Sequence, residues 1–321
     1  MVSKVAQNTF KRVLLNVMLQ NKSSAITRIK QQIAISINSK MAAVPGLSGV
    51  EITPEAIPLK RLPDYSQIIY RSAIAFKLAS SQSAILELAH QIMASLPLRN
   101  DKDLSQPFAV KTLQLPLSLP PKIRKEPEFS LNFQVELVSP GLLEFRLTDS
   151  SLADWLQNLI SANSVKLPNN PTKNTLNCFS VQYAHARCCS ILALAHQQGL
   201  IILKDGQLIQ PYPIPWLQDE PGATHQPRRL CLVHPAEKRL IAIVLDILED
   251  KENLEQQRGL KLALALSQAW EEFFKHCRIW GEVKTQTPKL AQARLGLVAV
   301  TQGLLRSLLK DCLGVSAPVE L

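Results

Sequence analysis

No long uninterrupted hydrophobic run occurs in this sequence of 321 residues, although 46% of the residues are hydrophobic. Residues 1–22 are basic and partly apolar, and Asn16 and Gln20 interrupt the apolar positions. This spacing predicts an amphipathic first helix and indicates neither a secretory signal nor a membrane span. We therefore expect a soluble chain with no membrane partner.

Glycine is scarce, with 11 residues in the chain, and the phosphate-binding patterns that require it are missing. Neither Gly-x-x-x-x-Gly-Lys-Ser/Thr nor Gly-x-Gly-x-x-Gly is present. The six histidines show no metal-ligand spacing, and His276 beside Cys277 is interpreted as a helix neighbour pair. These absences predict no cofactor, no metal and no self-contained catalysis.

The cysteines lack the Cys-x-x-Cys spacing of a zinc ribbon. They are interpreted as reduced thiols of an intracellular protein, so the expected location is the cytoplasm or an organelle stroma. All six lie in the C-terminal half, at Cys178, Cys188, Cys189, Cys231, Cys277 and Cys312.

Basic residues outnumber acidic ones by 36 to 26, which gives a formal net charge of +10. Residues 1–150 hold 18 basic and 11 acidic residues (+7), and residues 151–321 hold 18 and 15 (+3). This balance favours a polyanion such as RNA, and it suits an acidic protein partner equally well.

The first half of the sequence mixes helical and strand patterns. Apolar residues at helical steps predict helices over 25–40 and 85–96, and a further helix that begins at Tyr70. Alternating residues on both sides of Pro140-Gly141 predict a β-hairpin over 131–147. The other expected elements are a short strand near Val50–Ile52, a strand at Phe108–Leu115 in a loop over 98–128, and a helix at 150–160. The predicted fold class of residues 1–160 is α+β, with helices on one face of a small antiparallel sheet.

From Phe179 onward the sequence is nearly all helical, apart from a proline-rich excursion between Gly199 and Pro235. Residues 161–178 are polar and rich in asparagine and proline, which is typical of a linker. The predicted organisation is therefore an α+β domain at 1–160, a linker at 161–178 and an all-α helical bundle at 179–321.

The segment Tyr183-Ala-His-Ala-Arg187, followed by Ser190-Ile191, resembles the opening helix of the anticodon-binding domain of arginyl-tRNA synthetases. Leu313-Gly-Val-Ser-Ala-Pro-Val-Glu-Leu321 is similar to the Leu-Gly-Ile-x-x-Pro-x-x-Met terminus of that family. Landmarks in the family's order link these two segments, so the resemblance covers 179–321 strongly. It implies a DALR-type anticodon-binding helical bundle and a tRNA partner, with arginine tRNA as the first candidate.

Residues from about 50 to 160 resemble the family's N-terminal domain, which contacts the tRNA elbow, more weakly. The hairpin is similar to Val-x-x-x-Gly-Pro-Gly-Phe-Ile-Asn-Phe-x-Leu, but Leu142 and Glu144 replace Phe and Asn. Ala73 likewise replaces an Asn that contacts the D-loop in the family. The resemblance implies that Tyr70 and Arg71 contact RNA, and a buried Tyr70 without a ligand is the alternative.

Neither catalytic motif of a class I synthetase, His-x-Gly-His or Lys-Met-Ser-Lys-Ser, occurs in the sequence. The His and Lys groups of these motifs stabilise charge on the transferring phosphate. Where the resemblance places the catalytic domain, about eighteen residues lie at 161–178. We therefore expect this chain not to be an enzyme.

Anticodon domains receive unstacked bases on aromatic faces and hold phosphates with basic side chains. The alternative for Phe274 is core packing, and for Arg187 and Arg278 it is a solvated charge or an internal ion pair. The resemblance and the charge pattern nominate as RNA-binding residues Tyr183, Arg187, Arg228, Arg229, Phe274, Lys275, Arg278, Lys284, Arg294 and Leu321.

Three functional hypotheses follow from the sequence. The first is a protein that binds tRNA, or a tRNA-shaped RNA, without charging it. The second is a protein–protein interaction module that kept the bundle and lost the RNA, which the altered positions Ala73, Leu142 and Glu144 would explain. The third is an accessory subunit that acts in arginine–tRNA ligation together with a catalytic partner.

Overall fold

The computed structural model describes residues 25–41, 52–79, 81–96, 133–161, 167, 178–218, 228–251 and 254–321. The expected first helix at 1–22 and the whole predicted loop at 98–128, with its strand at Phe108–Leu115, lie outside these residues. The predicted linker at 161–178 also lies outside them, except for residues 161, 167 and 178. Within the described part, no helix combines the length and apolarity that crossing a membrane requires.

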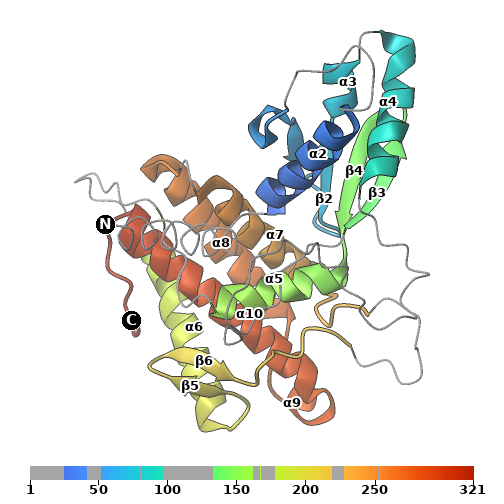
Figure 1. The fold of residues 1–321 in the computed structure, drawn as a ribbon. Coiled ribbons are helices and arrows are strands. Elements are labelled where there is room, and N and C mark those ends of the chain that lie inside the picture. Colours follow the sequence, from blue (N-terminus) through green and yellow to red (C-terminus); the bar gives the residue numbers. More distant parts are fainter. Residues whose placement is uncertain are drawn as a thin grey trace, which may run out of the picture.

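The N-terminal unit is built on a four-stranded antiparallel sheet in the order β1-β2-β4-β3 (Figure 1). The predicted hairpin is confirmed, because β3 (Phe133–Val138) pairs with β4 (Leu142–Leu147). On the other side of β4 lies β2 (Ile69–Ser72), and β1 (Leu59–Arg61) forms the edge next to β2.

One face of this sheet is apolar and the other is charged. Leu143 and Phe145 of β4 are fully buried, and Tyr70 of β2 pairs with Phe145 on the same face. Arg71 and Glu144 are paired on the opposite face. The helices that pack with this unit are α2 (Ala25–Met41), α3 (Ile74–Leu78) and α4 (Gln82–Ser95), and the short turn η1 (Pro54–Ala56) lies between α2 and β1 in the chain. The predicted α+β class is therefore confirmed.

The prediction of a helix beginning at Tyr70 is wrong, because Tyr70 lies in the central strand β2 and α3 begins only at Ile74. Strand β2 is hydrogen-bonded on both sides, to β1 and to β4, and this pairing outweighs the local helical pattern. Ile52, expected at the end of a short strand, instead pairs with the side chain of Asn38 through hydrogen bonds of 2.9 and 3.0 Å.

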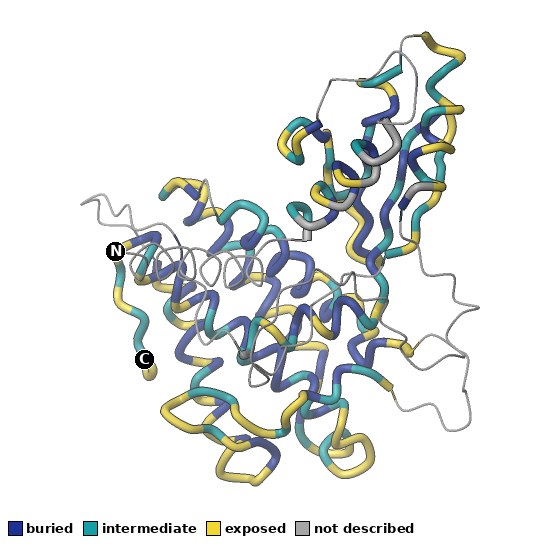
Figure 2. Tube along the Cα trace, viewed as in Figure 1, coloured by how far each residue is buried: buried dark blue, intermediate teal, exposed yellow. Residues whose placement is uncertain are grey.

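The C-terminal unit is a helical bundle, as predicted, centred on α10 (Pro288–Ser307), which packs against α5, α6, α7, α8 and α9. Figure 2 shows buried positions gathered in the middle of this bundle and exposed ones along the β5–β6 hairpin. Its other elements are α6 (Phe179–Gln197), β5 (Ile202–Lys204), β6 (Gln207–Gln210), α7 (Pro235–Asp250), α8 (Gln256–His276), α9 (Glu282–Gln286) and the π-turn η4 (Leu308–Cys312).

Helix α5 (Asp149–Ser161) corresponds to the helix predicted at 150–160, and it packs on α10 of the C-terminal bundle (Figure 1). Gln157 Oε1 accepts hydrogen bonds from the Ile214 backbone at 2.8 Å and from Trp216 Nε1 at 3.1 Å. Asp149 accepts another from the Leu230 backbone at 2.9 Å. Through these contacts α5, the last helix of the predicted 1–160 domain, packs against the C-terminal bundle.

Candidate RNA-binding surface

Helix α6 carries an exposed stripe of Phe179, Tyr183 and Arg187, spaced four residues apart. Phe179 is 62% exposed and Tyr183 47%, and their rings are stacked with centroids 6.4 Å apart and planes 23° apart. The core-facing side of the helix is apolar and buried, so the stripe faces solvent. Two large aromatic rings that stack without burial are suited to receive a planar ligand.

Helix α8 adds Phe274 to this stripe. The guanidinium carbon of Arg187 lies 5.0 Å from the centroid of the Phe274 ring, which is within cation–π range. Beneath it, the buried Trp270 lies 5.9 Å from the same ring and fixes its position. Because Phe274 stays 38% exposed, it is not a core residue. We call the four residues Phe179, Tyr183, Arg187 and Phe274 the α6–α8 surface.

The C-terminal tail, residues 314–321, lies along the neighbouring flank of α6. Gln182 Nε2 donates to the Ser316 carbonyl at 3.0 Å, and His185 Nδ1 lies 2.8 Å from the Pro318 carbonyl. Leu321, which the resemblance nominates, is 65% exposed at the end of this tail. Figure 1 shows the tail descending beside α6.

Two nominated residues are turned away from solvent. Tyr70 is fully buried and its hydroxyl donates to Glu249 Oε1 at 2.5 Å, so the buried alternative holds for this residue. Arg294 is only 11% exposed, pairs with the fully buried Glu237 at 2.7 Å, and also donates to the Arg278 carbonyl. The RNA-contact predictions for Tyr70 and Arg294 are therefore corrected, because both side chains are committed to internal partners.

The other nominated cations are spread over several elements. Arg71 pairs with Glu144 at 2.9 Å on the charged face of the sheet, and Lys284 Nζ donates to Gln198 at 2.9 Å. Arg228, Arg229, Lys275 and Arg278 are exposed, and the last two lie at the end of α8, just beyond Phe274. The structure thus brings Arg187, Phe274 and Tyr183 together, and it leaves Arg71 in the other unit.

Phe179, Gln182 and His185, which also belong to this region, are not among the RNA-binding residues nominated from the sequence. The aromatic spacing of Phe179 and Tyr183, four residues apart at the start of a helix, was a readable signal for Phe179. Gln182 and His185 contact tail residues that lie more than 130 positions away in the sequence, so no local sequence pattern could predict these contacts.

The two units meet at α7 through a polar cluster. Arg61 of β1 pairs with Asp246, and Tyr70 of β2 donates to Glu249. Burial raises the pKa of Glu249 to about 7, while the hydrogen bond from Tyr70 and the charge of Arg61 oppose that rise. Burial and the neighbouring Glu249 charge raise the pKa of Tyr70 well above its ordinary value. We call Arg61, Tyr70, Asp246 and Glu249 the inter-unit cluster.

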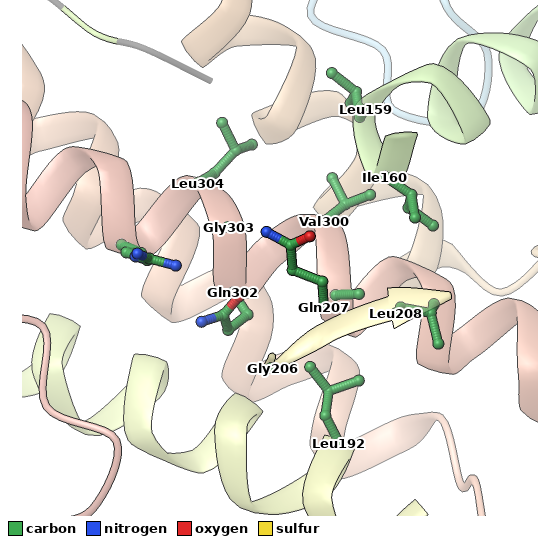
Figure 3. Close-up of a pocket in the computed structure, with 12 residues that line it drawn as sticks. Leu159, Ile160, Leu192, Gly206, Gln207, Leu208, Val300, Gln302, Gly303 and Leu304 are labelled. Carbon is green, nitrogen blue, oxygen red and sulfur yellow. The ribbon is translucent and has the colours of Figure 1, made fainter. Parts of the chain in front are cut away.

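A pocket lies over α10, between the end of α5 and the β5–β6 hairpin (Figure 3). Among the residues that the structure describes, Arg306 is the only charged one that lines the pocket, and a Cβ added at Gly303 would meet no atom within 4 Å. None of the nominated RNA-binding residues lines it, and none of the described lining residues is a carboxylic acid, a histidine, a lysine, a cysteine or a hydroxyl residue. Its apolar lining residues include Leu159, Ile160, Leu192, Leu208 and Val300. Among the described residues, no group of His, Cys, Asp and Glu is placed to hold a metal ion.

Residues 181–321 match the family model of the DALR anticodon binding domain. The C-terminal unit is therefore similar to an anticodon-binding domain, and the relatives it matches are arginine–tRNA ligases. The ligase of Gloeobacter violaceus is 35% identical over 135 residues, which cover 41% of this chain and 20% of the ligase. That of Heliobacterium modesticaldum is 33% identical over 144 residues, covering 44% of this chain and 22% of the ligase.

A third arginine–tRNA ligase, from a Synechococcus species, is 30% identical over 139 residues, 43% of this chain and 21% of the ligase. The chain thus spans about a fifth of the length of the ligases it matches. No solved structure gives a significant match.

Proposed function

We propose that this chain binds a tRNA, or an RNA shaped like one, through the α6–α8 surface of its anticodon-binding domain, and that it does not charge the RNA. The observation that carries the proposal is the placement of Arg187 over the exposed ring of Phe274, beside the stacked rings of Phe179 and Tyr183. Stacking on such rings contributes about 1–3 kcal/mol per base in single-stranded RNA recognition.

The bases of a loop would be received at this surface in an unstacked form. Phe179, Tyr183 and Phe274 offer ring faces, and the guanidinium plane of Arg187 offers both a stacking surface and a positive charge. Lys275 and Arg278 at the end of α8 supply further charge for backbone phosphates. Base contacts would give specificity here, and the cations would give the salt-dependent part of the affinity.

We propose that this chain does not charge the RNA because its sequence contains neither His-x-Gly-His nor Lys-Met-Ser-Lys-Ser. The matches to the ligases, each about a fifth of their length, are consistent with a binding function alone. An accessory role beside a catalytic partner uses the same RNA contacts, and it differs only in whether a second protein is required.

The test is retention of total tRNA on the purified chain at two salt concentrations, followed by sequencing of the bound RNA. We expect enrichment of arginine tRNAs and a steep loss of affinity as the salt concentration rises. Incubation of the same complex with arginine and ATP should give no aminoacyl-tRNA. No retention at low salt would overturn the RNA proposal and favour the protein-interaction hypothesis, and charging by the pure chain would overturn the non-catalytic part.

A further inference from the structure

The exposed line of α6 on which Arg187 lies continues to Gln198 at the C-terminal cap of the helix. Leu194 on this line is 41% exposed, and Gln198 is exposed as well. At 3.6 residues per turn, both lie within about 20° of Arg187 around the helix axis. The helical rise places Gln198 about 16 Å beyond Arg187 along that axis. A single strand that leaves Arg187 in this direction needs more than one nucleotide to reach Gln198.

The side-chain amide of Gln198 is held in one orientation. Trp280 Nε1 donates to its Oε1 at 2.9 Å, and Lys284 Nζ donates to the same oxygen at 2.9 Å. An indole N–H and an ammonium group can only donate, so the oxygen of the amide, and not its nitrogen, must face them. Gly281, with a φ of +72°, makes the turn between Trp280 and α9, the helix that carries Lys284.

This arrangement uses both lone pairs of Oε1 and leaves Nε2 to donate. Within the part of the chain that the structure describes, Nε2 of the exposed Gln198 has no hydrogen-bond partner. The ammonium group of Lys284 also keeps hydrogens beyond the one given to Gln198. We call Gln198, Trp280 and Lys284 the Gln198 subsite, which presents donors only.

A donor-only site discriminates among nucleobases. The usual glutamine contact with adenine is bidentate and needs the amide oxygen as an acceptor, but this oxygen is occupied in Gln198. Cytosine presents O2 and N3, and guanine presents O6 and N7, as neighbouring acceptors on one edge. These two bases therefore suit the Gln198 subsite better than adenine does.

We propose that Gln198, oriented by Trp280 and Lys284, selects cytosine or guanine over adenine in the RNA strand that leaves the α6–α8 surface. The inference rests on the proposed function and adds a specificity-determining residue to it. The family resemblance nominated Lys284 only as a source of charge, and it nominated neither Gln198 nor Trp280. Phosphate oxygens also accept hydrogen bonds, so the test must separate a base contact from a backbone contact.

The test compares the dissociation constants of a cytidine nonamer and an adenosine nonamer for the full chain. Gln198→Ala should lower the preference for cytidine about fivefold, the effect of losing one ordinary hydrogen bond. Gln198→Glu keeps an oxygen facing Trp280 and Lys284 but replaces the donor with an acceptor, so it should lower the preference at least as much. Gln197→Ala, at the exposed glutamine one position earlier, is the matched control and should leave the preference unchanged.

Trp280→Phe tests the orienting role, because it keeps an aromatic ring and removes the N–H. Oε1 of Gln198 then regains an acceptor site, so the adenosine nonamer should bind more tightly while the cytidine nonamer changes little. A purely structural role of Trp280 would not shift the two affinities apart in this way.

Equal weakening of both nonamers by Gln198→Ala would indicate a phosphate contact and overturn the base selection. If Gln198→Ala changes neither affinity while Arg187→Ala weakens both, the Gln198 subsite is wrong and the proposed function stands. If the wild type binds neither the nonamers nor tRNA, the proposed function fails and the subsite fails with it.

Discussion

Arg187 and Phe274, 87 positions apart in the sequence, lie with the guanidinium carbon 5.0 Å from the ring centroid and connect α6 to α8 on the solvent side of the bundle. This contact keeps an aromatic ring and a positively charged group next to each other at a solvent-exposed position. Buried residues such as Trp270 support it from below, so its geometry is set by the bundle core. This is why the function proposed here depends on the C-terminal unit.

Replacing Tyr70 with Phe should loosen the junction between the two units. The substitution removes the hydroxyl that donates to Glu249 at 2.5 Å and leaves a buried carboxyl without that partner. We expect the free energy of unfolding to fall by about 1–3 kcal/mol, measured by urea denaturation. Tyr65→Phe, at a 40% exposed tyrosine, is the control and should have no effect. Equal stability of the two variants would contradict the role assigned to the Tyr70 hydroxyl.

The inter-unit cluster predicts a pH dependence of stability. The pKa of Glu249 is raised from its ordinary 4.5 to about 7, so in the native state this carboxyl keeps its proton longer than in the unfolded chain. Its contribution is fully present below pH 4.5 and is lost as the pH rises through 7, a change of at most about 3 kcal/mol.

Unfolding midpoints of the wild type and Glu249→Gln between pH 5 and 8 measure this contribution. The wild type should lose stability over that range relative to the variant, which cannot ionise at this position. His185 has a lowered pKa and therefore the opposite slope, but it is common to both proteins. Parallel pH profiles of the two proteins would show that Glu249 does not titrate as described.

Gly296 should not tolerate a side chain. A Cβ there would lie 2.6 Å from the Trp216 ring and 3.0 Å from the Ile214 side chain, so Gly296→Ala forces the loop held by Gln157 away from α10. We expect a loss of about 1–3 kcal/mol from this overpacking. Gly303→Ala on the same helix meets nothing within 4 Å and should instead stabilise by about 0.5–1 kcal/mol. Thermal unfolding compares the two variants, and a neutral Gly296→Ala would refute the contact.

The substitution Arg294→Met tests whether the Arg294 side chain stabilises the fold or contacts RNA. It leaves Glu237, which is fully buried, without its ionic partner, and such a loss costs about 3–5 kcal/mol. Arg258→Ala removes the exposed pair with Asp250 and should cost less than about 1 kcal/mol. Differential scanning calorimetry measures both. A stable Arg294→Met protein that has lost RNA affinity would restore Arg294 to the RNA-binding residues.

The sequence correctly predicted those helices and strands whose apolar periodicity matches the way they pack in the structure. Helix α4, the β3–β4 hairpin and α5 follow this rule. The stretch after Tyr70 fits a helix and a buried strand equally well, and only the pairing of β2 with both neighbours decides for the strand. The β5–β6 hairpin was missed although Asp205-Gly206, with φ values of 52° and 75°, is a readable hairpin-turn signal.

The candidate site was predictable only as far as the family resemblance reached. It nominated Arg187 on the first helix of the bundle and Phe274 on a later helix, but it could not show that the two side chains meet or that Arg294 turns inward to Glu237. Contacts such as that of Arg61 with Asp246 join residues 185 positions apart and depend on how two units pack. Charge alone does not report such packing, because a buried and a solvated arginine look the same in a sequence.

The most direct test of the account is the dissociation constant of an arginine tRNA transcript for Arg187→Ala, Phe274→Ala and the double variant. Lys204→Ala, on the hairpin that follows the far end of α6, is the charge-matched control. Each single variant should weaken binding about fivefold or more, and the double variant should lose less than the product of the two, because the side chains act as one contact. Arg187→Ala should also lower the salt slope by about one. If both single variants bind like Lys204→Ala, the α6–α8 surface is not where this chain holds RNA.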